Sequence, residues 1–400
     1  MTTKAPVYLS ALGIVSPLGH GKEEVCDNLL AGRQPGVVQR RDLLVDGAPL
    51  FVAQVEALLP KPPERLAAYA SRNLGLTILA LEEIRSQVDT AISRHGAHRV
   101  AVVMGTSTSG IAHGEEAVAY ARDNGRLPDG FDVRMQEIGS TGEALARYLG
   151  VTAPAYTVST ACSSGAHALA AARRLLQTGI ADAVLAGGAD SICRLTTNGF
   201  QALSALSAEI CNPFSRNRDG IMIGEGAAIF LVQREASEIA LFGVGASSDA
   251  YSMTAPEPEG HGIVRAVRDA LEDAGMTSSD IDYIQLHGTG TRHNDEVESK
   301  VVQQVFGAAT PCSSSKAQIG HTLGAAGAMG AAHCWLAASD MNKKRLLPPH
   351  VWDGQAEDGL LADSLVERGA HLAPTAPGIF LSNAFGFGGS NVSLVVGRAG

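Results

Sequence analysis

The stretch TVSTACSSGAHALAAARRLL, residues 157–176, places one cysteine between a β-like run and an alanine-rich segment. Cys162 is surrounded by Ser, Thr and Gly, and hydroxyls at positions 160–164 are expected to cap a helix that ends at Gly179. A thiol at a helix N-terminus lies near free N–H groups, which lower its pKa. The sequence therefore predicts a nucleophile, with a buried, unreactive thiol as the alternative.

A second stretch with the same order of elements predicts a duplicated fold. Within residues 99–111 an apolar run is followed by GTST at 105–108, and within residues 281–295 an apolar run is followed by GTGT at 288–291. Each is followed by a strand, a small-residue turn and an Ala/Gly-rich helix, at 157–176 and at 313–336. Two related halves of βαβ character explain this order.

The chain of 400 residues is long enough for two or three domains. We divide it into residues 1–240 and 241–400, because a strand-like run ends the first half. Apolar spacing predicts one amphipathic helix over 65–88 and another over 260–275. The abundance of Ala and Gly after Cys162 predicts helices that pack closely against neighbouring layers.

Composition excludes several classes of function. The formal charge of -10 argues against general nucleic-acid binding. Residues 1–19 show no signal-peptide pattern, and the apolar stretch 319–339 is rich in Gly and contains two His, so we expect a packed helix and no membrane association. The six cysteines show neither CxxC nor zinc spacing, which favours reduced thiols in the cytoplasm.

Two histidines and one lysine stand at positions that packing does not explain. His287 ends an apolar strand, at the edge where parallel sheets place their sites. His321 precedes a glycine-rich helix, and Lys316 lies in an otherwise uncharged stretch. With Cys162, these residues predict acyl transfer through a thioester, in which imidazoles polarise a carbonyl. A zinc site is the competing interpretation, although the spacing does not support it.

Five ordered motifs make the sequence recognisable: TACSSG, NPFSRNRDGIMIGEGA, HGTGTRHND, SSKAQIGHTLGAAG and NAFGFGGSN. In these motifs the chain resembles the β-ketoacyl-acyl-carrier-protein synthases, in particular the elongation class with Cys, His and His. The resemblance spans nearly the whole chain. It implies a thiolase-like α/β fold, in which duplicated βαβαβαββ halves form five layers, α-β-α-β-α, and it implies a homodimer.

The resemblance also implies roles for the site residues. Cys162 would take the acyl chain from an acyl carrier protein. His287 and His321 would bind the malonyl thioester carbonyl, promote decarboxylation and stabilise the enolate. The backbone N–H groups of Cys162 and Phe387 would form the oxyanion hole, and the Phe387 side chain would act as a gate.

Further positions carry supporting roles by the same resemblance. Lys316 should pair with Glu298 and orient the site, and Asp295 should be structural. Thr289 and Thr291 should bind the phosphopantetheine arm that carries the substrates. No intrinsic cofactor and no metal are implied.

Three further residues, Thr108, Phe200 and Phe385, should shape the acyl pocket. An acidic chain needs a local basic patch to dock an acidic carrier protein. Its candidates are Lys61, Arg65 and Arg72, for which ordinary solvated helix charge is the alternative.

Two other functions fit parts of the pattern. In the first, the chain is the ketosynthase subunit of a heterodimer with a partner resembling a chain length factor, and the heterodimer makes a specialised polyene or polyketide. A non-condensing subunit usually lacks the active cysteine, whereas Cys162 is present. A thiolase or an initiating synthase would place its catalytic residues in other motifs.

Overall fold

One mixed sheet of eleven strands forms the frame of the protein, for which the computed structural model describes residues 6–399. Five strands of its N-terminal part lie in the order β6 (Ala155–Val158), β5 (Val100–Gly105), β7 (Ala183–Asp190), β9 (Gly226–Gln233) and β1 (Val7–Ser16). The C-terminal part continues with β10 (Ile239–Ser248), β14 (Ser390–Arg398), β13 (Ile379–Gly386), β11 (Tyr283–Gln285) and β12 (Cys312–Ser313), and β2 (Gly19–His20) pairs with β1.

The two parts repeat the same strand pattern outward from the centre. β1 and β10 pair antiparallel where Val7 faces Leu241 and Tyr8 faces Ala240. From there each part has two antiparallel pairings and then two parallel ones, through β9, β7, β5 and β6 on one side and through β14, β13, β11 and β12 on the other. This confirms the predicted duplication.

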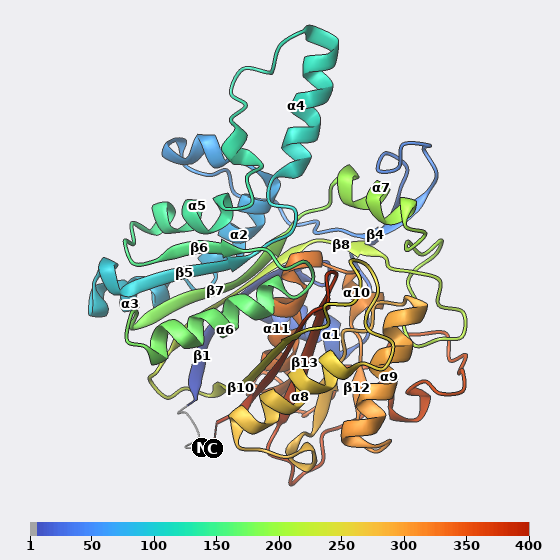
Figure 1. Cartoon of the computed structure of the whole chain (residues 1–400). Coiled ribbons are helices and arrows are strands. Elements are labelled where there is room, and N and C mark those ends of the chain that lie inside the picture. Colours follow the sequence, from blue (N-terminus) through green and yellow to red (C-terminus); the bar gives the residue numbers. More distant parts are fainter. Residues whose placement is uncertain (1–5, 400) are drawn as a thin grey trace.

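Helices divide the fold into five layers, as Figure 1 shows. On the outside of the N-terminal strands lie α2 (Arg72–Glu82), α3 (Arg85–His95) and α5 (Ser140–Leu149). The outer layer of the C-terminal strands contains α8 (His261–Ala274) and α9 (Arg292–Phe306). Between the two sets of strands lie α6 (Ser164–Gln177) and α11 (Ala326–Ala338), which contact each other and strands of both parts. The α-β-α-β-α prediction is therefore confirmed.

The two central helices approach closely because small residues line their contact. A Cβ atom added to Gly165 would lie 2.7 Å from the backbone nitrogen of Ala328. One added to Gly327 would lie 2.7 Å from both the backbone nitrogen and the Cβ atom of Ala166. These distances are too short for any side chain, so the glycines allow the two helices to cross.

The helix predicted over 65–88 is wrong in its extent. The chain instead forms a 3-10 turn over Glu64–Tyr69, then α2, then α3 after a break at Ile84. The side chain of Ser71 accepts a hydrogen bond from the Leu74 backbone and so starts α2 as an N-cap. Continuous apolar spacing concealed this local signal.

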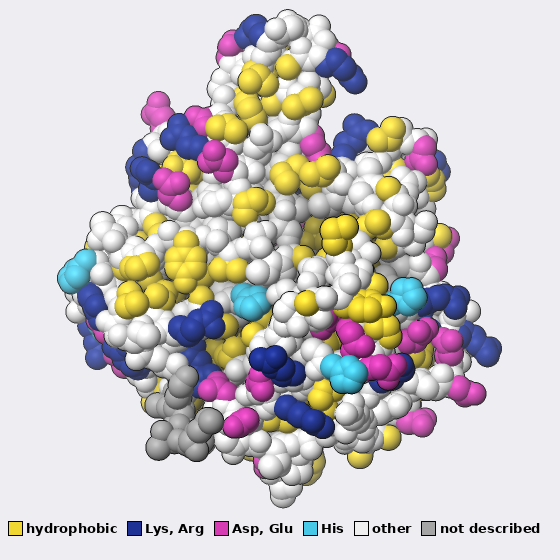
Figure 2. All heavy atoms as spheres, viewed as in Figure 1, with side chains coloured by type: hydrophobic (Ala, Val, Ile, Leu, Met, Phe, Trp, Pro, Cys, Tyr) yellow, Lys and Arg dark blue, Asp and Glu magenta, His cyan; other side chains and the backbone are white. Residues whose placement is uncertain are grey.

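Further helices and a small second sheet complete the structure. They are α1 (Lys22–Leu30), α4 (Ile111–Asn124), α7 (Arg194–Ala202) and α10 (Lys316–Ile319), with a small sheet of β3 (Val37–Arg40), β4 (Leu50–Ala53) and β8 (Ile223–Gly224). The arm formed by α4 and the loop after it protrudes from the body in Figure 1. Apolar side chains cover much of it in Figure 2, and its exposed members include Val118, Leu127 and Val133. Across residues 6–399, no helix has the length and apolar character needed to span a membrane.

Candidate active site

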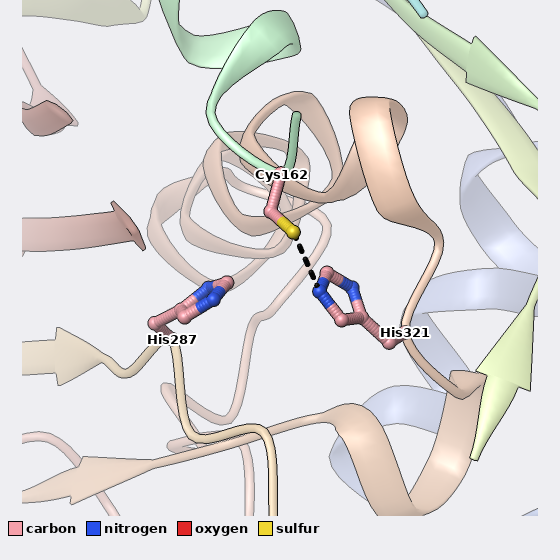
Figure 3. Close-up of side chains that lie close together, drawn as sticks. All are labelled: Cys162, His287 and His321. Carbon is pink, nitrogen blue, oxygen red and sulfur yellow. Dashed lines mark hydrogen bonds between the residues drawn. The ribbon is translucent and has the colours of Figure 1, made fainter. Parts of the chain in front are cut away.

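Three predicted residues meet at one point between the two halves (Figure 3). Cys162 lies in the turn before α6, His287 follows β11, and His321 lies between α10 and α11. The Cys162 Sγ atom lies 3.0 Å from Nε2 of His321. The rings of His287 and His321 meet edge to face with their centroids 5.4 Å apart. The fold therefore brings together one nucleophile and two imidazoles.

A sharp turn presents Cys162. The preceding residue, Ala161, has φ +52°, which is uncommon for a residue with a side chain. The hydroxyls of Ser163 and Ser164 donate to the backbone carbonyls of Thr160 and Ala161, respectively. The prediction that such hydroxyls cap α6 is wrong for Ser163, the N-cap residue, since its hydroxyl bonds back into the turn. The hydroxyls hold the turn instead.

The surroundings of His321 select its tautomer. Its Nδ1 accepts a hydrogen bond from the backbone N–H of Leu323, at 3.2 Å. The proton of the neutral ring therefore lies on Nε2, which faces Cys162. In this state His321 is a hydrogen-bond donor to the sulfur, and it is equally able to donate to a developing negative charge.

His287 is held through its backbone. Its N–H donates to Glu298 Oε1 at 2.8 Å, and the Lys316 ammonium donates to its carbonyl oxygen. The ring of Phe385 packs against the His287 ring with centroids 5.6 Å apart. Within residues 6–399 no ion pair joins Lys316 to Glu298, so the direct pairing predicted for them is wrong. Both residues instead bind the His287 peptide from opposite ends.

Burial controls the charges of the site. It raises the pKa of the Cys162 thiol to about 11, against the opposing effects of the Lys316 charge and the Phe387 N–H. The expectation of a lowered thiol pKa is therefore wrong for the resting protein, because desolvation outweighs the helix terminus. Burial and the nearby Lys316 charge hold the pKa of His287 and of His321 well below the usual range. Both imidazoles are neutral donors at pH 7.

The ligand atoms of Cys162, His287 and His321 lie within 4.8 Å of one another, so their geometry alone could hold one metal ion. The charges do not fit a dication. Lys316 is buried beside the cluster, and a metal-binding thiol must lose the proton that this site retains. The zinc interpretation therefore finds support in the positions of the three residues but not in their electrostatics.

A cavity of about 490 Å³ leads to the cluster. Eight of the predicted site residues line it: Cys162, Phe200, His287, Thr289, Thr291, His321, Phe385 and Phe387. The rings of Phe200 and Phe387 lie against each other with centroids 5.5 Å apart, and Phe387 is 38% exposed. The hydroxyls of Thr289 and Thr291 are 2.9 Å apart. An aromatic pair and a pair of hydroxyls thus border the path to Cys162.

Four predicted residues lie outside this cavity: Lys316 and Glu298, which bind the His287 backbone, and Asp295 and Thr108. Asp295 is fully buried and accepts hydrogen bonds from the N–H groups of Phe214 and Gly290, an arrangement that holds the loop after His287. Thr108 does not line the cavity, because its hydroxyl and its N–H both donate to Asp190. In the single chain, therefore, the structure does not place Thr108 at the acyl pocket.

The predicted basic patch is reduced by internal pairing. The guanidinium of Arg72 binds Glu225, whose carboxylate is buried, and it also donates to the Val55 carbonyl. The Arg72 guanidinium is therefore paired within the protein, and we remove Arg72 from the predicted basic patch. Lys61 and Arg65 are exposed, and Arg65 donates to the Tyr148 carbonyl.

Sequence reasoning missed two parts of the site. Asp190 ends β7 and binds the turn after β5 and the turn that carries His321, although its only signal was an acid after the small residues GGA. The second part is a loop from Asp249 to Pro256 that contributes to the cavity lining. No motif marks that loop, because its role depends on where the fold places it.

Comparison with known proteins gives the family. The models "Beta-ketoacyl synthase, N-terminal domain" and "Beta-ketoacyl synthase, C-terminal domain" match residues 4–238 and 239–351. The chain is 32% identical to 3-oxoacyl-[acyl-carrier-protein] synthase 2 of Rhizobium meliloti, over 98% of each chain.

Two solved structures extend this similarity. The ketosynthase ApeO of Xenorhabdus doucetiae, solved with its chain length factor ApeC, is 43% identical, with a TM-score of 0.93 and coverage of 99% of this chain and 98% of that one. The ishigamide ketosynthase/chain length factor is 28% identical, with a TM-score of 0.87 and coverage of 99% of this chain and 100% of that one. With both family models matched in order, the chain belongs to the beta-ketoacyl synthase family.

Proposed function

We propose that Cys162, His287 and His321 perform the reaction of this family, the decarboxylative condensation of a malonyl unit with an acyl chain. The protein is a 3-oxoacyl-[acyl-carrier-protein] synthase and thus an acyltransferase. The observation that carries the residue assignment is the contact of Cys162 Sγ with His321 Nε2 at the end of the cavity. Residues 1–240 would supply the nucleophile and residues 241–400 the two imidazoles.

Acylation comes first. The Cys162 thiol attacks the carbonyl of an acyl thioester on a carrier protein, so that the new C–S bond forms and the C–S bond to the carrier breaks. The thiol proton passes to the departing carrier sulfur, which leaves as a thiol. The N–H groups of Phe387 and Cys162 both interact with the sulfur and lower its pKa. They are therefore positioned to stabilise an oxyanion formed beside it.

Condensation follows on the acylated enzyme. The malonyl thioester carbonyl accepts hydrogen bonds from His287 and His321, and loss of CO2 leaves an enolate. The enolate carbon attacks the acyl carbonyl on Cys162, a C–C bond forms, and the C–S bond breaks. Neutral imidazoles suit this step, because they donate hydrogen bonds where negative charge develops and do not protonate the carbanion as imidazolium ions would.

The cavity suggests how the substrate arm enters. The pair of hydroxyls on Thr289 and Thr291 borders the path and provides polar contacts for the amides of phosphopantetheine. The Phe387 ring packs against the Phe200 ring at the exposed end of the cavity, so rotation of the Phe387 side chain would open or close the path to Cys162. No intrinsic cofactor takes part in these steps.

We infer that the chain is the condensing subunit of a heterodimer with a partner resembling a chain length factor. The 43% identity to a ketosynthase solved with such a partner supports this. Two surfaces are available for the contact: the edge strand β6, whose Tyr156 is exposed, and the apolar α4 arm with Val118 and Leu127.

We also infer a cytoplasmic location for the protein, because all six of its cysteines are unpaired.

Intact-protein mass spectrometry tests the assignment. The parent and Cys162→Ala are incubated with a panel of acyl-carrier-protein thioesters, each alone and with a candidate partner subunit. An acyl adduct on the parent that is lost in Cys162→Ala is expected. An equal adduct on both proteins would refute Cys162 as the nucleophile, and full activity of the isolated chain as a homodimer would refute the heterodimer.

A further inference from the structure

Asp190 is a buried carboxylate at the end of β7 that takes no direct part in the proposed chemistry. It is 0% exposed. Its oxygens accept hydrogen bonds from the N–H groups of Ser107 and Thr108, from the hydroxyls of Thr106 and Thr108, and from the N–H of Gly324. Five donor groups thus bind one carboxylate, and the Ser107 N–H is shared between its two oxygens.

The hydrogen-bond directions define a negatively charged group. The Thr106 hydroxyl accepts from the side chain of Asn73 and from the N–H of Ser109, so its own proton is directed to Asp190. The Thr108 hydroxyl accepts from the N–H of Ser191 and likewise donates to Asp190. Every neighbour is a donor, an arrangement that stabilises an ionised carboxylate and opposes the rise that burial causes in the pKa of Asp190.

One side of this network reaches the nucleophile turn. Ser107, whose N–H donates to both oxygens of Asp190, donates its hydroxyl to the carbonyl of Ala161 at 3.3 Å. Ala161 has the positive φ that presents Cys162. The strain of that turn requires support from the surrounding structure, and Ser107 supplies part of it.

The other side reaches the turn that carries His321. The Gly324 N–H donates to Asp190 Oδ2 at 2.5 Å. The residue before it, Leu323, has φ +50° and donates its N–H to His321 Nδ1, the bond that selects the tautomer. A Cβ atom on Gly324 would lie 2.5 Å from the Ser107 nitrogen, so the two turns are in direct contact at this point.

We propose that Asp190 is a positioning residue, whose carboxylate holds the Cys162 turn and the His321 turn at the separation that lets Sγ meet Nε2. This inference rests on the proposed function, because it concerns the same pair of side chains. The carboxylate comes from the first half and the Gly324 N–H from the second. Asp190 therefore links the two halves by a hydrogen bond beside the Cys162–His321 pair.

The test replaces Asp190 by Asn, which is similar in shape but turns an NH2 group toward the donors. We expect acyl transfer to Cys162 to slow by about one hundredfold, the effect of a misplacement of about 1 Å in a catalytic pair. The matched control is Asp273→Asn, which removes a partner of the buried Arg173 between α6 and α8, away from the cluster. It should lower the melting temperature and leave acyl transfer within about twofold of the parent.

Alkylation of Cys162 by iodoacetamide at pH 9 adds a readout that a purely structural role would not give. The negative charge of Asp190 raises the pKa of Cys162, but less than the Phe387 N–H lowers it. If the variant loses an N–H donor such as His321 Nε2, the pKa rises and alkylation slows by about tenfold. Faster alkylation, or an unchanged rate, would overturn the proposal, because the two turns would then have kept their positions without Asp190.

Two further comparisons keep the outcome decisive. If Asp190→Asn does not fold, Ser107→Ala removes only the link to Ala161 and should slow acyl transfer severalfold with the fold intact. A parent without any acyl adduct would refute the proposed function itself. A parent with a normal adduct and an Asp190→Asn variant that acylates equally fast would refute only this inference.

Discussion

Replacing His287 by Ala should separate the two half-reactions of the enzyme. His321 contacts Cys162 Sγ at 3.0 Å, whereas the His287 ring has no hydrogen bond to the sulfur and packs on Phe385. Acylation should therefore be nearly unchanged in His287→Ala. Condensation loses one of two donors to the malonyl carbonyl, and one such donor is worth about 10²–10³ in rate, or about 2.7–4 kcal/mol.

The assay follows each step on the same sample. Mass spectrometry gives the rate at which Cys162 gains the acyl group, and release of labelled CO2 from malonyl-carrier protein gives the rate of decarboxylation. His333→Leu is the control, since it removes a buried histidine of α11 that lies outside the cavity. Equal slowing of acylation and decarboxylation in His287→Ala would refute the separate roles, and so would unchanged decarboxylation.

Three other changes test the electrostatics and the packing. Because burial raises the Cys162 pKa to about 11, its alkylation rate should rise about tenfold per pH unit between pH 7 and 10; a plateau near pH 8 would contradict this. Burial lowers the pKa of His333 to about 3, so unfolding takes up a proton below pH 6.5 and stability falls with falling pH. His333→Leu should therefore gain about 2 kcal/mol over the parent from pH 6.5 to pH 5 in denaturant unfolding, and parallel curves would contradict it. Gly165→Ala should cost roughly 1–3 kcal/mol in the same assay, because the methyl group meets the Ala328 backbone; unchanged stability would refute the close crossing.

Much of the site could be predicted because its residues stand at junctions. Cys162 and His287 follow strands and His321 lies in the turn between two helices, and the repeated halves bring these turns to the centre of the fold. Small residues predicted the close helices, and Gly165 shows the reason directly. The local sequence pattern was sufficient to predict a structural feature wherever a single turn or a single helix contact determines that feature.

Two of the errors share one physical cause, which is that the surroundings of a buried group are set by the whole fold. A helix terminus near Cys162 predicts a lowered pKa, but desolvation reverses the sign. The resemblance implied a direct pairing of Lys316 with Glu298, but the His287 backbone lies between them and bonds to both. The place of Thr108 at the acyl pocket stays a prediction, since in the single chain Asp190 takes both its donors.

These buried charges explain how a thiol with a high pKa can serve as a nucleophile. Full ionisation in the resting state would place a thiolate in a dry site at a large cost in free energy. Charge develops only during attack, when the Phe387 N–H and the His321 Nε2–H already face the sulfur and the Lys316 charge lies nearby. The stabilisation then depends on fixed distances and requires no rearrangement at the moment of reaction. A carboxylate that holds both turns in place would therefore affect the rate as strongly as a group that touches the substrate.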